Sequence, residues 1–199
     1  MKIVVVGASG TLGKALVEHL GQENELVQVA KSQGEYRLDI TDGNSIKALF
    51  ERVGKVDAIV SVTGNLHFGA LEEMTAQNFS LGLNDKLLGQ VNLALIGQHY
   101  LNKGGSITLT SGIVSEEPII GGCNATTVNA AIEGFVRAAA IELKNGMRIN
   151  AVSPSVVTES LDVYGPFFPG YESVSAKRVA MAFQRSLEGP LSGQTFKVW

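Results

Sequence analysis

The chain has 199 residues, 45% of them hydrophobic and 18% charged, which is enough for one globular domain with a sizeable core. Its net charge of −3 argues against nucleic acid or acidic membranes as partners. The first apolar run is too short for a membrane span, and the single cysteine, Cys123, allows no intrachain disulfide and favours a reducing, cytoplasmic setting.

Short apolar runs alternate with longer helical patterns along the whole chain. We expect strands over residues 2–6, 25–30, 36–38, 56–62, 106–110, 148–152 and 195–198. Apolar spacing predicts helices over residues 12–20, 42–53, 76–101, 125–143 and 176–187. Alternation of this kind is typical of a parallel sheet covered by helices. The expected fold class is therefore α/β, a single Rossmann-type doubly wound domain over residues 1–199.

The two longest predicted helices, over residues 76–101 and 125–143, are apolar on most of their sides. A helix of this kind has to be covered on more than its sheet-facing side. A second copy of the chain is the simplest cover. We therefore expect a homodimer or homotetramer that forms through these two helices.

Residues 7–13, which follow the first strand, read GASGTLG. Glycine permits a tight turn and a close backbone approach to a pyrophosphate, and the helix that follows offers free N–H donors. This context indicates a dinucleotide-binding loop. Its candidate contacts are Gly7, Ser9, Gly10, Thr11, Leu12 and Gly13. A plain structural turn, which also favours glycine, is the alternative.

The end of the second predicted strand bears on the choice of cofactor. An acidic residue usually binds the ribose hydroxyls of NAD(H) there, but this chain has Ala30. Lys31 and Ser32, which follow, offer a cation and a hydroxyl suited to a phosphate. NADP(H) is favoured over NAD(H), with a solvated loop lysine as the alternative.

These motifs and several later ones follow in the order and spacing of a known family. They are LDIT at 38–41, VTG at 62–64, GGSITLTSG at 104–112 and RINAVSPSVV at 148–157. The chain resembles the short-chain dehydrogenases/reductases over essentially its whole length. The resemblance implies that Asp39 meets the adenine amino group, that Ile40 packs on its ring, and that Thr63 and Gly64 lie beside the adenosine ribose.

The resemblance also implies a nicotinamide end and a lid. Pro154 and Val157 would lie beside the nicotinamide carboxamide, whereas the roles of Thr158 and Glu159 stay open. Residues 163–171, VYGPFFPGY, stand in the place of the family's substrate lid. The two phenylalanines of this segment fit an apolar substrate wall or a patch covered by a partner chain.

The family's catalytic residues are replaced. By position, the tyrosine and lysine of its Tyr-x-x-x-Lys pair fall on Ala125 and Asn129, and its asparagine falls on Lys86. Its serine falls on Ser111 or, without a gap, on Gly112. This pattern resembles a small bacterial subgroup of the family that lacks the usual active site.

Lysine and asparagine have exchanged positions, and in the family fold both side chains project toward one small volume. We hypothesise that Lys86 supplies the cation near the nicotinamide, Asn129 a supporting hydrogen bond and Ser111 or Thr110 a hydroxyl. The alternative is that Lys86 is a solvated helix lysine. Cys123 is expected to be buried, and the three scattered histidines predict no metal site.

The favoured function is an NADP(H)-binding oxidoreductase of short-chain type with a non-standard catalytic site, acting on an unknown carbonyl or alcohol. Because Ala125 can transfer no proton, a catalytically silent scaffold that senses NADP(H) or binds a partner protein is the alternative. A third possibility is a lyase or isomerase that uses the cofactor pocket without net hydride transfer.

Overall fold

A computed structural model describes all residues, 1–199, and places seven strands in one sheet of order β3-β2-β1-β4-β5-β6-β7. Every neighbouring pair is parallel. The strands are β1 (Lys2–Val6), β2 (Glu25–Ala30), β3 (Tyr36–Arg37), β4 (Val56–Ser61), β5 (Leu101–Thr110), β6 (Arg148–Pro154) and β7 (Thr195–Val198). The predicted α/β class, a Rossmann-type parallel sheet with helices on both faces, is confirmed.

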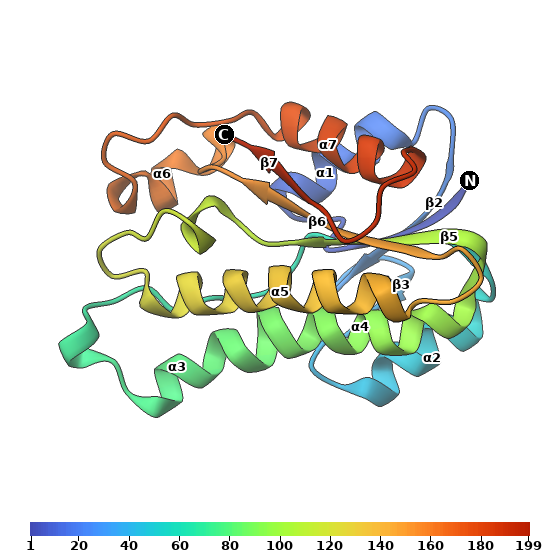
Figure 1. Ribbon diagram of the computed structural model, residues 1–199, viewed down its shortest axis with the longest axis horizontal. Helices are drawn as coiled ribbons and strands as arrows, with labels where there is room; N and C mark the ends of the chain where they lie inside the picture. The colour runs from blue at the N-terminus through green and yellow to red at the C-terminus, as the bar shows by residue number, and fades with distance from the viewer.

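Helices cover both faces of the sheet, with α1 and α7 on one side and α2, α4 and α5 on the other (Figure 1). The longer helices are α1 (Thr11–Leu20), α2 (Gly43–Val53), α3 (Ala76–Gly82), α4 (Gly89–Gly97), α5 (Cys123–Glu142) and α7 (Ala176–Glu188). The short α6 (Leu161–Tyr164) lies in the predicted lid.

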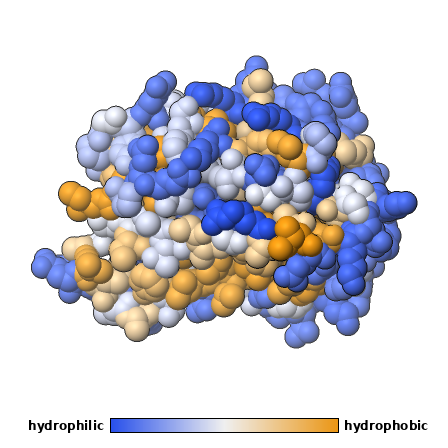
Figure 2. All heavy atoms as spheres, in the orientation of Figure 1, coloured by the Kyte–Doolittle hydropathy of each residue, from blue (hydrophilic) through white to orange (hydrophobic).

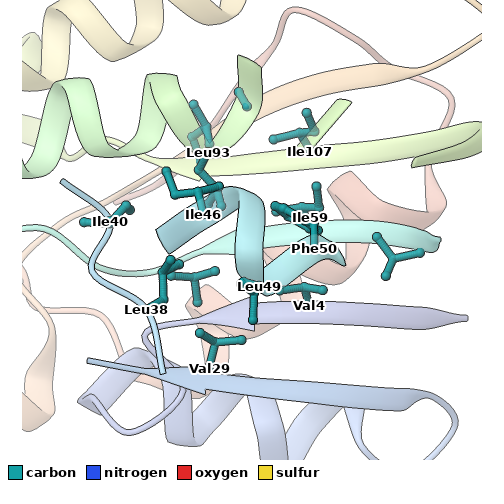
Figure 3. Packing of buried hydrophobic residues seen from close by; sticks show 14 of the residues in the cluster. Val4, Val29, Leu38, Ile40, Ile46, Leu49, Phe50, Ile59, Leu93 and Ile107 are labelled. Atoms are coloured by element: carbon teal, nitrogen blue, oxygen red, sulfur yellow. The ribbon is translucent and has the colours of Figure 1, made fainter. Parts of the chain in front are cut away.

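Alternation along the strands divides the core into two halves. In β1, Ile3 and Val5 join the cluster beneath α1 and α7, whereas Val4 and Val6 join the larger cluster of 22 residues on the opposite face. Figure 3 shows side chains of α2, among them Phe50, packed against the strands in this larger cluster. Burial on both faces explains why the central strands read as unbroken apolar runs.

The predicted helix over 76–101 differs from the observed one. A π-helical segment, Leu83–Leu88, separates α3 from α4, and the chain enters β5 already at Leu101. The buried polar residues of this segment are Asp85 and Lys86. Segments of this type are frequent at functional sites.

The outer surfaces of α4 and α5 expose apolar side chains. Leu88 and Leu95 are about half exposed, and Ile141 on α5 is almost fully exposed. Figure 2 shows apolar residues gathered over the lower half of the molecule, where these helices lie. No helix of the structure combines the length and the apolar character that crossing a bilayer requires.

Candidate functional site

The candidate site lies at the carboxyl ends of the strands, where the strand order reverses between β1 and β4. The glycine loop between β1 and α1 forms one wall. Gly7 has φ +92°, and a Cβ there would lie 2.7 Å from the Val62 carbonyl oxygen. A Cβ on Gly13 would lie 2.0 Å from the Gly7 carbonyl oxygen, so both positions require glycine.

No side chain caps the N-terminus of α1, whose N-cap residue is Gly10. The first amides of a helix have no partner within the helix, and they attract anions together with the helix dipole. The tight loop and this uncapped helix end fit a pyrophosphate. Ser9 and Gly10 belong to the loop and Gly13 to the first turn of α1, whereas Thr11 and Leu12 line the main cavity.

A small pocket of about 40 Å³ next to the loop corresponds to the predicted adenine end. The predicted residues that line it are Gly7, Lys31, Asp39, Ile40 and Thr63. Hydrogen bonds from the hydroxyl and the backbone N–H of Thr41 hold the pKa of the Asp39 carboxyl below its usual value, and Lys31 contributes to this lowering. Ser32 does not line this pocket.

The main cavity, of about 480 Å³, adjoins this pocket through Thr63 and Asn65, which line both. It brings together nine of the predicted site residues from distant parts of the chain. They are Thr11, Leu12, Thr63, Gly64, Lys86, Ser111, Asn129, Pro154 and Val157.

Lys86 is buried in this cavity, so the alternative of a solvated helix lysine is wrong. Its residue exposure is 8%, and its stem packs on Gly64, where a Cβ would lie 2.7 Å from the Lys86 side chain. The ammonium donates a hydrogen bond of 3.1 Å to the Ser111 carbonyl oxygen, and none of the four ion pairs of the structure includes it. Burial lowers the pKa of Lys86 to about 8.

Asn129 lines the same cavity from α5 and is 2% exposed. Its amide oxygen is buried without a hydrogen-bond partner, which is costly for a polar atom unless a ligand completes the site. A Cβ on Gly112 would lie 3.1 Å from the Asn129 amide nitrogen. Lys86 and Asn129 therefore face one cavity, although no hydrogen bond joins them.

Ser111 uses both of its polar groups within the protein. Its carbonyl accepts from Lys86, and its hydroxyl donates to the Glu133 carboxylate at 2.8 Å. Ser115 donates to the same carboxylate oxygen at 2.8 Å. Glu133 was not predicted as a site residue, although it is the one carboxylate within AAIEGFVRAAA and stands one helical turn after Asn129.

An apolar wall closes the other end of the cavity, and most of it was not predicted. Its residues are Leu66, Phe68, Ile113, Val114, Tyr164 and Phe168. The Phe68 ring lies 5.0 Å from the Phe167 ring and 5.9 Å from the Tyr164 ring, so the loop after β4 packs against the lid. Ala125, which is fully buried, belongs to the same apolar cluster.

The structure also assigns the residues whose roles were open. The Glu159 carboxylate accepts from the backbone N–H of Ala176, the first residue of α7, and the Thr158 hydroxyl donates to Ser173. Both residues therefore join the chain before the lid to the chain after it. Cys123 is exposed at the start of α5, so its predicted burial is wrong. The helix turns it outward and buries Asn124 and Ala125 instead.

Comparisons with known proteins agree with this geometry. Residues 2–186 match the family model described as enoyl-(acyl carrier protein) reductase. The crystal structure of the protein lin1944 from Listeria innocua is 46% identical, covers 100% of both chains and superposes with a TM-score of 0.98. A small-chain dehydrogenase in complex with NADPH is 27% identical with a TM-score of 0.89, over 100% of this chain and 96% of that one.

Curated relatives match over shorter segments. The 3-oxoacyl-[acyl-carrier-protein] reductase FabG of Buchnera aphidicola is 25% identical over 77% of this chain and 72% of its own length. Hydroxynaphthalene reductase arp2 of Aspergillus fumigatus is 30% identical over 62% of this chain, and the match spans 47% of that protein, less than half its length. The chain belongs to the short-chain dehydrogenases/reductases, a family of oxidoreductases.

The buried charge of Lys86 predicts a pH-dependent change in stability. Below the folded-state pKa of about 8 the buried ammonium is destabilising in full, and this cost disappears as the pH rises toward 10.5, the ordinary lysine value. We expect K86M to raise the free energy of unfolding at neutral pH by on the order of 2–3 kcal/mol, and the gain to shrink above pH 8.

Urea unfolding of both proteins at neutral and alkaline pH measures this difference. The matched control is K14M, which removes an exposed lysine of α1 and should leave stability nearly unchanged. If K86M is less stable than the wild type at neutral pH, the prediction that the buried, unpaired ammonium destabilises the fold is contradicted.

Proposed function

We propose that this chain is an NADP(H)-dependent oxidoreductase that interconverts a carbonyl compound and its alcohol, with Lys86 as the proton donor. The buried ammonium of Lys86, without a carboxylate partner and facing the main cavity, is the observation that carries this proposal. Placing an unpaired charge there is costly, and the cost is explained if the charge serves a ligand.

The residues of the site fit the cofactor. The glycine loop and the N-terminus of α1 would hold the pyrophosphate, the pocket at Asp39 and Ile40 the adenine, and the main cavity beside Pro154 the nicotinamide. When bound, NADP(H) supplies or accepts the hydride. The orphaned Asn129 amide oxygen can accept a hydrogen bond from a ribose hydroxyl.

Lys86 has the geometry of a proton donor. One of its three N–H groups is bound by the Ser111 carbonyl, which leaves two for a substrate oxygen. In reduction, the ammonium would stabilise the developing negative charge on that oxygen and transfer a proton to it. The neutral amine that remains would recover its proton from solvent, since its pKa of about 8 lies near neutrality.

The preference for NADP(H) rests on Lys31, which lines the adenine pocket next to Asp39. A charge-assisted hydrogen bond to the 2′-phosphate favours the phosphorylated cofactor.

We expect K31A to weaken NADPH binding about 10–100-fold and to leave NADH binding unchanged. Calorimetric titration with each cofactor measures both affinities, with K47A, an exposed lysine of α2, as the control. Equal losses for NADPH and NADH would contradict a phosphate role of Lys31.

The pH dependence of hydride transfer tests Lys86 directly. If the ammonium is the acid, the rate of reduction falls as the pH rises through about 8, where the side chain loses its proton. We expect K86M to lower the rate by about 10²–10⁴ while NADPH still binds. Oxidation of bound NADPH by a panel of carbonyl compounds, followed across pH, measures both effects.

The same experiment separates the proposed enzyme from the alternative scaffold, which is favoured by the fully buried Ala125 methyl group in place of an acid. NADPH binding without reduction of any carbonyl would support a silent NADP(H) sensor. A wild-type rate that does not change between pH 7 and 9 would contradict Lys86 as the acid.

We also propose that the chain assembles as a homodimer or homotetramer through α4 and α5. Leu88, the last residue of the π-helical segment, and Leu95 of α4 are seven residues apart and both about half exposed, and together with Ile141 of α5 they leave an apolar surface. We expect L95E to produce monomers in sedimentation velocity runs at micromolar concentration. M181E, on the exposed side of α7, is the control and should keep the wild-type mass. A monomeric wild-type protein would overturn this assembly.

A further inference from the structure

The main cavity has one charged side chain among its lining residues, and that side chain is Lys86. No carboxylate lines the cavity to balance a cationic substrate, so an amine placed near Lys86 would be repelled. The free N–H groups of Lys86 instead favour a substrate oxygen, and the apolar residues beyond Lys86 offer no partner for a further charge on the substrate.

The cavity changes from polar to apolar over a short distance. On α5, Asn129 belongs to the polar end, and Ala125, one turn earlier on the same helix face, belongs to the apolar cluster. Side chains one turn apart are separated by about 5–6 Å. In the turn after β5 the same change occurs within three residues, from Ser111 to Ile113. The apolar part of a substrate must therefore begin close to its oxygen.

Aromatic rings form much of the apolar end. Phe68 comes from the loop after β4, and Phe168 comes from the lid, where the Tyr171 ring supports it edge-on at 5.4 Å. Phe68 is fixed in turn by its contacts with the Tyr164 and Phe167 rings. Rigid aromatic walls favour a planar ring, which packs on them by stacking or edge-to-face contact. Ala125 lines this end of the cavity from α5, and its fully buried methyl group presents a small apolar surface there.

We propose that the substrate is an uncharged aryl ketone or aldehyde, or the corresponding alcohol, with a ring bonded directly to the carbonyl carbon. The oxygen binds Lys86, and the ring packs over Ala125 between Phe68 and Phe168. In reduction the carbonyl carbon gains a hydride from NADPH, which becomes NADP⁺, and the oxygen gains a proton from Lys86. This assignment rests on the proposed function and adds the class of substrate to it.

Two variants test the ring site. A125L fills the space over α5, and F168A removes one wall from the exposed lid without overpacking the interior. We expect each to weaken the binding of acetophenone to the NADPH complex at least about tenfold, because the variants remove or block the apolar contact. NADPH affinity should not change. A130L, at an exposed position of α5, is the matched control and should behave as the wild type.

The measurements are calorimetric NADPH affinity, saturation-transfer NMR of acetophenone, and NADPH oxidation with acetophenone, benzaldehyde, hydroxyacetone and glyceraldehyde. Preference for the aryl compounds, lost in A125L and F168A, supports the proposal. Preference for the small polar carbonyls, or unchanged acetophenone binding in both variants, overturns it while the oxidoreductase function stands. If NADPH does not bind, the proposed function fails, and NMR of acetophenone with the free protein still decides whether the ring site exists.

Discussion

The site depends on the burial of one ammonium against one backbone carbonyl. Lys86 reaches Ser111 only because Gly64 has no side chain and adopts φ +121°, which lets the lysine stem pass over the backbone. The loop after β4, the π-helical segment and the end of β5 are thereby tied together at the centre of the cavity. Because burying an unpaired charge is unfavourable, this contact lowers the free energy of unfolding of the protein.

Behind this contact lies a second layer of polar groups. Glu133 accepts hydrogen bonds from Ser111 and Ser115, and so holds the turn after β5 whose carbonyl receives the lysine. The family resemblance led to Ser111 as a source of a hydroxyl for the substrate. The structure shows instead that the Ser111 hydroxyl is engaged by Glu133, while its carbonyl faces Lys86. Ser111 therefore positions Lys86 through its backbone carbonyl, while its hydroxyl belongs to the supporting contact with Glu133.

Most of the architecture could be predicted from the sequence, because strands buried on both faces leave continuous apolar runs and α/β alternation restricts the topology. The cofactor side could also be anticipated, since a glycine loop has strict backbone requirements at Gly7 and Gly13. The apolar wall could not be predicted, because Phe68 and Phe168 are a hundred residues apart in the chain and line one cavity only through the packing of two loops. The burial of Lys86 could not be predicted from the sequence either, since it depends on a local change of helix type that residue spacing does not reveal.

That change of helix type has a consequence for how the long helix presents its faces. A π-helical turn accommodates about one additional residue, which rotates everything after it by about 100° relative to an unbroken α-helix. The apolar positions before and after Leu83–Leu88 therefore follow two different phases. A single 3.6-residue repeat laid over both halves therefore cannot assign the buried face of either. The phase shift turns Lys86 toward the cavity and lets α4 present Leu93 and Ala94 to the sheet while Leu95 on the same helix stays exposed.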